Sequence, residues 1–236
     1  MRNIFVCFFL MVMLSCKDEP QPGPQPGVLN ESSQFAECNR ALSACLDGPA
    51  AYCLFGFKWG QTNSFTPTGF GVGGPREPGG QISFSFQEEN GLINTHAQIN
   101  LPSKSFTSLP SCAKDEIRKA LKEWEAVANI AFEELPENSQ SDIRFFVADI
   151  RQSGIGYPNY PSLPCNSIAG NVVIQSGVRF NTCDSFHDFL LHEIGHVLGL
   201  GHVNSQNIMS PDFIENNISG LQAGDIQGII ELYSEK

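Results

Sequence analysis

The sequence predicts an α+β fold, and three patterns along the chain support this class. Apolar residues recur at three-to-four spacing over 115–129 and again over 221–233, as they do in amphipathic helices. Residues 81–86 alternate apolar and polar side chains, as half-buried strands do. Further strand candidates lie at 132–135, 142–148 and 171–174. A third helix, which we expect to begin at Ser185, carries the most informative motif of the chain.

The helix over 115–129 and the helix that begins at Ser185 each have a recognisable start and apolar face. Over 115–129 the apolar face is formed by Ile117, Leu121 and Trp124, with Lys and Glu opposite, and Ser108 or Ser111 is a candidate cap. Ser185 is followed three residues later by Asp188, which is the spacing of a capping box. Phe186, Ile194 and Val197 give the helix that begins at Ser185 its apolar face.

The motif H-E-x-x-H-x-x-G-x-x-H runs from His192 to His202. His192 and His196 are four residues apart, so on a helix they share one face and can bind the same zinc ion. Glu193 lies beside that ion, where its carboxylate can take a proton from a water in the open ligand position. Gly199 suits the left-handed backbone that ends a helix, and the turn would bring His202 back as the third ligand. Three neutral histidines with one open position are typical of a catalytic zinc site.

A methionine follows shortly afterwards, in the string Asn-Ile-Met-Ser-Pro at 207–211. With the histidine motif, this string resembles the metzincin metalloproteases, most closely the matrixin and serralysin-like branch, in which Met209 would occupy the Met-turn beneath the zinc. The resemblance implies a metzincin-type zincin fold. That fold has a twisted, mostly parallel sheet with an antiparallel edge strand, a long first helix, an active-site helix and a C-terminal helix. The resemblance covers residues 54–236, which we expect to be the catalytic domain.

The resemblance also implies where a substrate would lie. The string Gly-Ile-Gly-Tyr-Pro at 154–158 falls where those families place the edge strand that lines the cleft, which makes Tyr157 a cleft candidate. Ser210, Pro211 and Phe213 follow the Met-turn, and we expect them to form the outer wall of the pocket for the residue after the cut.

The chain departs from the matrixins in two respects. Residues 97–186 contain no histidine, so we do not expect the second, structural zinc of many matrixins, and we interpret His96 and His187 as ordinary solvated or core histidines. Ca²⁺ could bind Asp and Asn oxygens, but no loop has a recognisable ligand spacing. The latency motif P-R-C-G-x-P-D is also missing. Residues 28–53 are therefore either an N-terminal extension or a short pro-segment, in which a cysteine or Asp47 could occupy the fourth zinc position.

The N-terminus predicts export. Residues 1–15 contain an apolar run that is too short to span a bilayer and fits a signal peptide. It ends at Cys16, which resembles the lipidated cysteine of bacterial lipoproteins, and residues 16–27 read as a proline-rich spacer. The expected location is the outer membrane or cell surface, with the lipid as the only membrane contact. A plain secretory signal, giving a secreted or periplasmic protein, is the alternative.

Six cysteines remain after residue 16, an even number that suggests disulfides in an oxidising compartment. Their spacing does not fit C-x-x-C zinc chemistry. Many pairings are possible, and our hypothesis is Cys165–Cys183, because both residues flank the strand that precedes the active-site helix.

Together these patterns predict a zinc-dependent metalloendopeptidase with one catalytic Zn²⁺ and with proteins or peptides as substrates. We expect a monomer, and the net charge of −11 argues against nucleic acid as a partner. The main alternative is a surface-displayed binding lipoprotein that keeps the scaffold without catalysis. A zinc hydrolase that acts on cell-wall peptides or other amides would differ only in substrate.

Overall fold

A five-stranded sheet with the order β4-β1-β5-β7-β6 forms the centre of the fold. Its strands are β1 (Gly80–Gln87), β4 (Ile130–Glu134), β5 (Ile143–Ala148), β6 (Gly154–Gly156) and β7 (Asn171–Gln175). All neighbours pair in parallel except β6, which runs antiparallel to β7 at the edge of the sheet. The predicted α+β class and the mostly parallel sheet with an antiparallel edge strand are therefore confirmed.

The computed structural model describes residue 38 and residues 45–67, 71–89, 91–162 and 164–236. These residues belong to one compact unit, which spans 31–236. The predicted signal peptide, Cys16 and the spacer lie outside the described residues, and so does most of the stretch 28–44. None of the helices in the described part has the length and apolar character needed to cross a membrane.

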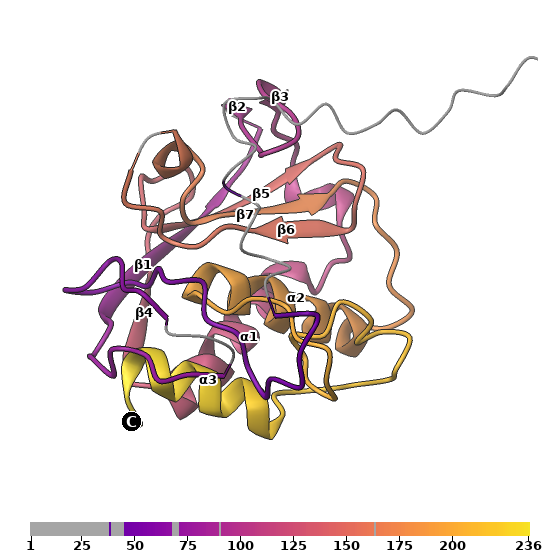
Figure 1. Ribbon diagram of the computed structural model, residues 1–236. Helices are drawn as coiled ribbons and strands as arrows, with labels where there is room; N and C mark the ends of the chain where they lie inside the picture. Colours follow the sequence, from indigo (N-terminus) through magenta and orange to yellow (C-terminus); the bar gives the residue numbers. More distant parts are fainter. Residues whose placement is uncertain (1–37, 39–44, 68–70, 90, 163) are drawn as a thin grey trace, which may run out of the picture. The chain divides into compact units, whose positions relative to one another are not determined.

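Three helices pack together on one side of the sheet: α1 (Ala113–Val127), α2 (Cys183–Leu198) and α3 (Ala223–Tyr233) (Figure 1). The predicted apolar face of α1 is buried, with Trp124 at 0% exposure, and the Trp124 indole N–H donates to the Leu191 carbonyl of α2. Phe145 and Val147 of β5 point into the same core. The active-site helix α2 is thus held between the sheet and α1.

The starts of two helices differ from the sequence prediction. Helix α1 begins at Ala113 after Cys112, which makes no side-chain capping bond, so neither Ser108 nor Ser111 caps it. Helix α2 begins at Cys183, two residues before Ser185, and the Thr182 hydroxyl caps it by accepting the Ser185 N–H. Asp188 instead accepts the backbone N–H of Gly220. The capping-box prediction failed because Thr182, a favoured capping residue three positions ahead of Ser185, caps the helix at an earlier start.

The opposite face of the sheet has a smaller core of its own. Phe146 and Ala148 alternate with the inward residues of β5 and pack here with Val173, beneath the loop that contains the 3-10 helix η3 (Cys165–Ser167). A short hairpin, β2 (Leu92–Ile93) with β3 (Leu101–Pro102), adds Ile93 to this cluster. Another 3-10 helix, η2 (Phe106–Ser108), precedes α1.

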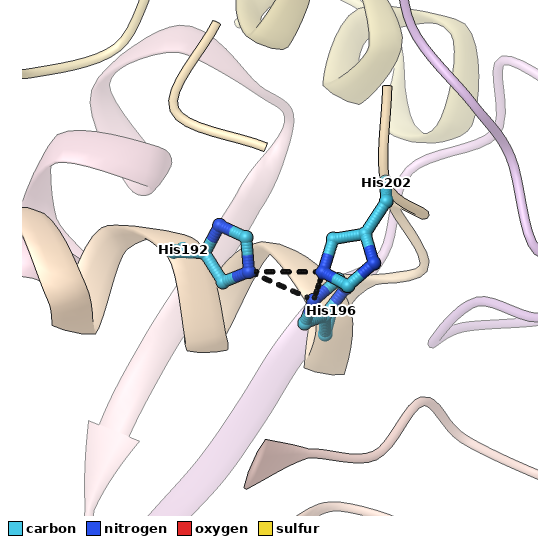
Figure 2. Close-up of side chains that lie close together, drawn as sticks. All are labelled: His192, His196 and His202. Carbon is cyan, nitrogen blue, oxygen red and sulfur yellow. Dashed lines mark hydrogen bonds between the residues drawn. The ribbon is translucent and has the colours of Figure 1, made fainter. Parts of the chain in front are cut away.

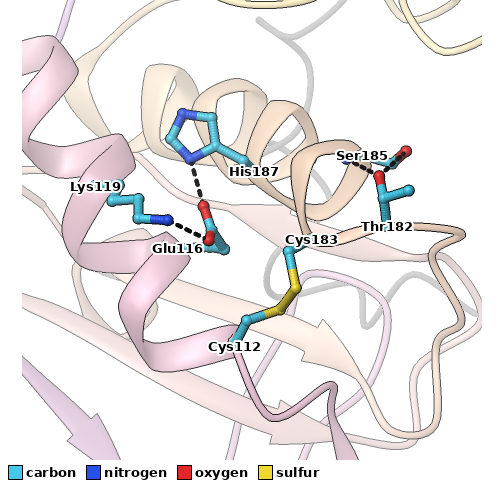
Figure 3. Close-up of a disulfide and its surroundings, with 7 residues drawn as sticks. All are labelled: Cys112, Glu116, Lys119, Thr182, Cys183, Ser185 and His187. Atoms are coloured by element: carbon cyan, nitrogen blue, oxygen red, sulfur yellow. Dashed lines mark hydrogen bonds and ion pairs between the residues drawn. A yellow bond between two sulfur atoms is a disulfide. The ribbon is translucent and has the colours of Figure 1, made fainter.

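All six cysteines are paired, but not in the way we expected. The disulfides are Cys38–Cys165, Cys45–Cys53 and Cys112–Cys183, so the Cys165–Cys183 hypothesis is wrong. Cys183 follows the strand as predicted, but it starts α2 and faces the start of α1 (Figure 3). Cys165 lies on the opposite face of the sheet, in contact with Cys38.

Candidate metal centre and active site

The three predicted zinc ligands meet at the C-terminal end of α2. His192 and His196 project from one face of the helix, and α2 ends at Gly199, which has the expected left-handed backbone with φ of 112°. This turn returns the chain so that His202 faces the other two rings (Figure 2). The Nε2 atoms lie 3.1 Å apart for His192–His196 and His196–His202, and 3.2 Å apart for His192–His202.

This triangle fits a zinc ion. Tetrahedral ligands at the usual Zn–N distance of about 2.0–2.1 Å are separated by roughly 3.3 Å, close to the spacing observed here. The other ring nitrogen of His192 donates to the Ile208 carbonyl at 2.7 Å, and that of His196 donates to the Leu200 carbonyl at 2.8 Å. These bonds place the proton on Nδ1 and leave the Nε2 lone pairs directed at a common point.

The electrostatics of the site favour neutral histidines. Burial lowers the pKa of His192 to about 3 and that of His202 to about 4, and it lowers the pKa of His196 well below its ordinary value. The neighbouring rings lower the pKa of His192 and His196 further. All three rings are therefore neutral at neutral pH, as metal ligands must be.

Glu193 lies within the same buried region, next to the first ligand. Burial raises the pKa of its carboxyl group to about 8, and the backbone N–H of Gly156 opposes this shift. A cation held by the three histidines would lower the pKa again. A carboxyl group whose pKa is held near neutral pH suits a group that takes and returns a proton.

The edge strand β6 lies directly against α2, and its glycines make this possible. A Cβ atom added at Gly156 would overlap the Glu193 carbonyl oxygen, and one at Gly154 would overlap the ring of Phe189. Ser153 and Tyr157 make their backbone bonds to β7, which leaves the backbone groups of Gly154 and Gly156 on the outer edge of the sheet. The N–H of Gly156 on this outer edge acts on the Glu193 carboxyl group.

The segment expected to form the Met-turn packs against α2. Met209 is buried, and a Cβ at Gly195 would overlap its sulfur, so the methionine lies against the helix between the two ligands. Asp225 of α3 fixes the turn by accepting the backbone N–H groups of Ile208 and Met209. Sequence reasoning missed this role, although Asp225 is the third residue of α3 and also accepts the N–H of its cap residue, Gln222.

The residues predicted to line the substrate cleft differ in their exposure and in their distance from the histidines. The ring of Phe213 stacks on His192 with centroids 5.0 Å apart, and Phe213 also lines a cavity of about 450 Å³ beside α2. Ser210 is buried and Pro211 is exposed at the start of that segment. The Tyr157 side chain is 1% exposed and its hydroxyl accepts the backbone N–H of His96, so it lies in the core of the opposite face rather than in a cleft.

Two histidines outside the motif have other partners. His187 of α2 lies 3.2 Å from Glu116 of α1 (Figure 3), and its other ring nitrogen lies 2.9 Å from Glu123 of the same helix. His96 is buried and bonded to the Tyr157 hydroxyl through Nδ1. Within the described residues, His192, His196 and His202 form the one group of three or more side chains that could hold a metal ion.

Comparisons with known proteins point to one family. Residues 168–234 match the Peptidase_M10 family model, described as Matrixin. The chain is 31% identical to matrix metalloproteinase-26 of Homo sapiens over 60% of its own length and 58% of that protein. It is 30% identical to the hatching enzyme of Paracentrotus lividus, over 51% of this chain and 22% of that protein. It is 31% identical to metalloendoproteinase 1 of Glycine max, over 51% and 45%. The chain thus matches less than two thirds of the length of each relative.

Proposed function

We propose that this chain, a matrixin-like metzincin, is a zinc-dependent endopeptidase that hydrolyses peptide bonds within proteins. The observation that carries the proposal is the triangle of three Nε2 atoms, 3.1–3.2 Å apart, together with the buried carboxyl group of Glu193, the residue after the first of these histidines. A site kept only for binding has no need of a carboxyl group in this position. The similarity to metalloproteinases supports the same reading.

The chain's own residues can transfer the proton and hold the substrate. When bound, zinc supplies a Lewis acid that polarises the scissile carbonyl and makes a water a better nucleophile at neutral pH. Glu193 accepts the proton of the attacking water and then delivers it to the leaving amine. The outer edge of β6 offers the backbone groups of Gly154 and the carbonyl of Gly156 to an extended peptide, which would add to the sheet as a further strand, while the Gly156 N–H is directed at Glu193. Phe213 and the cavity beside it receive the side chain that follows the cut.

The test is digestion of casein or gelatin by the purified chain, with and without 1,10-phenanthroline, beside the Glu193→Ala variant. We expect cleavage that the chelator abolishes, and we expect the variant to lose cleavage while it retains one zinc per chain. Cleavage by the variant would contradict the role of Glu193. Stoichiometric zinc in the wild type without turnover on any protein or peptide would favour the inactive, substrate-binding alternative.

We further propose that the chain is exported and held at a membrane surface by a lipid on Cys16. The three disulfides support an oxidising compartment. The sequence before residue 28 supports the signal peptide and the spacer. Labelling with a radioactive fatty acid tests the anchor: we expect label in the wild type and none in Cys16→Ser. Unlabelled wild-type protein in the culture medium would point to the plain secretory signal.

A further inference from the structure

The loop that follows α2 decides the geometry of two of the three ligands. The carbonyl of Leu200 accepts the Nδ1–H of His196, and His202 follows two residues later. No helix or strand covers residues 199–210, and the Val203–Met209 bond is a backbone bond that closes this loop on itself. The Leu200 N–H donates to the Gly195 carbonyl of α2 at 2.9 Å, which holds one side of the residue, and the peptides on either side of Leu200 are bonded to a second segment of the chain.

The segment Ala50–Phe57 supplies that support. The Phe55 N–H donates to the Gly199 carbonyl at 2.9 Å, and the Gly201 N–H donates to the Cys53 carbonyl at 2.9 Å. Leu54 and Leu200 thus form an antiparallel bridge with a bond on each side. The ring of Phe55 meets the ring of His196 edge-on, with centroids 5.9 Å apart.

A second contact holds the far end of the same loop. The Asn207 side-chain amide donates to the Ala51 carbonyl at 2.7 Å, two residues before the Met-turn methionine. Two glycines permit the close approach: a Cβ at Gly199 would overlap the Phe57 carbonyl oxygen, and one at Gly224 would overlap the Ala51 carbonyl oxygen. The segment is thus bonded backbone to backbone to the start of the loop, and its Ala51 carbonyl is bonded to the Asn207 side chain at the far end.

A disulfide fixes the segment in turn. Cys45–Cys53 closes a short loop, both cysteines are buried, and the carbonyl of Cys53 is itself the acceptor for Gly201. The disulfide limits the movement of Cys53, and it therefore also limits the movement of the carbonyl that bonds the loop carrying His202. Groups that orient metal ligands commonly change metal affinity by about 10–100-fold when they are removed.

From these contacts we propose that Ala50–Phe57 is a positioning element of the metal centre rather than a removable pro-segment, and that the Cys45–Cys53 disulfide sets its zinc affinity. This inference rests on the proposed zinc site but not on catalysis. The inference gives Phe55 and the Cys45–Cys53 disulfide a role in orienting the histidine ligands. Neither the histidine motif nor the family likeness assigns this role.

The test measures the zinc dissociation constant of the purified chain by competition with a chromophoric chelator. We expect the Cys45→Ser/Cys53→Ser variant to bind zinc about 10-fold or more weakly than the wild type. The matched control is Cys38→Ser/Cys165→Ser, which removes a disulfide on the opposite face of the sheet and should change the affinity by less than about 3-fold. Phe55→Ala, which leaves both disulfides in place, should also weaken binding, and it keeps the test valid if the double variant does not fold.

Three outcomes would overturn the proposal: unchanged affinity in a folded Cys45→Ser/Cys53→Ser variant, unchanged affinity in Phe55→Ala, or an equal loss in the control pair. The endopeptidase proposal fails separately, if the wild type binds zinc tightly and cleaves nothing. In that case the affinities of the variants still decide whether the segment positions the ligands.

Discussion

At the scale of single residues, the site depends on which nitrogen of each imidazole carries the proton. Ile208 and Leu200 each present a backbone carbonyl to the Nδ1 atom of one ligand, and this choice leaves Nε2 for the metal. The spacing of the motif predicts the three ligands. It does not predict the acceptors, because Leu200 and Ile208 act through their backbone and leave no signature in residue type.

The low pKa values of the histidines predict an acid-sensitive fold in the metal-free chain. His192 and His202 titrate in the unfolded chain near 6.5, but at about 3 and 4 when buried. Their contribution to stability is therefore complete above pH 6.5 and declines as the pH falls towards 4. Glu193 acts in the opposite direction, because its raised pKa stabilises the fold below the unfolded value of 4.5 and loses that contribution as the pH rises through 8.

With three histidines against one carboxyl group, the free energy of unfolding should fall between pH 6.5 and pH 5.5. The slope for each group is at most about 1.4 kcal/mol per pH unit. Urea denaturation with a chelator present measures it. Glu193→Gln should make the decline steeper. A flat profile would mean that the rings are less buried than they are in this structure.

At the scale of elements, β6 and α2 lie so close together that no side chain fits at Gly156. In Gly156→Ala the new methyl group would meet the Glu193 carbonyl and the side chain of Val197, so strand and helix would have to separate. We expect a loss of about 1–3 kcal/mol or more in unfolding free energy. Gly91→Ala is the control, because nothing lies within 4 Å of its Cβ position. Equal stability of the two variants, by thermal denaturation, would show that β6 does not press on the helix.

The link between α3 and the Met-turn gives a second prediction at this scale. Asp225→Asn keeps the size of the side chain but replaces one acceptor oxygen by a donor that faces backbone N–H groups. We expect a loss of about 2–4 kcal/mol, together with weaker zinc binding through the displaced Ile208 carbonyl. Asp149→Asn removes the same charge at an exposed ion pair and should cost under about 1 kcal/mol. If both variants unfold at the same urea concentration, Asp225 does not fix the turn.

The sequence predicts an element well where local burial of apolar side chains determines it, and poorly where contacts between distant parts of the chain determine it. The strands and helices with periodic apolar faces, such as β1 and α1, follow from the sequence, because burial decides them locally. The boundary of α2 and the surroundings of Tyr157 do not. Thr182 caps α2 ahead of the start predicted at Ser185, and a long-range hydrogen bond from the His96 N–H holds the Tyr157 hydroxyl in the opposite core. The predicted Cys165–Cys183 pairing failed because each of these cysteines pairs with a distant residue, Cys165 with Cys38 and Cys183 with Cys112, at separations of 127 and 71 residues.

At the scale of the whole described unit, each disulfide secures a different part. Cys112–Cys183 joins the starts of α1 and α2, Cys45–Cys53 lies beside the ligand loop, and Cys38–Cys165 lies on the far face of the sheet. The last of these spans 127 residues of sequence. The exposed stretch 60–67 lies within that span.

A specific protease site inserted after Thr66 tests this arrangement. After cleavage, a denaturing gel without reductant should show one band of full mass, and a gel with reductant should show two. In the Cys38→Ser/Cys165→Ser variant the two fragments should separate without reductant. Separation of the wild type without reductant would contradict the Cys38–Cys165 pairing.

The Cys38–Cys165 bond turns residues 38–165 into a closed covalent ring, and a ring needs two breaks before it comes apart. For a chain tethered at Cys16, as proposed above, one cut anywhere between residues 39 and 164 leaves the histidine site attached to the membrane. Release would require a reductant as well, which an oxidising compartment does not supply. A protease that sheds this domain in a single step must therefore cut ahead of Cys38.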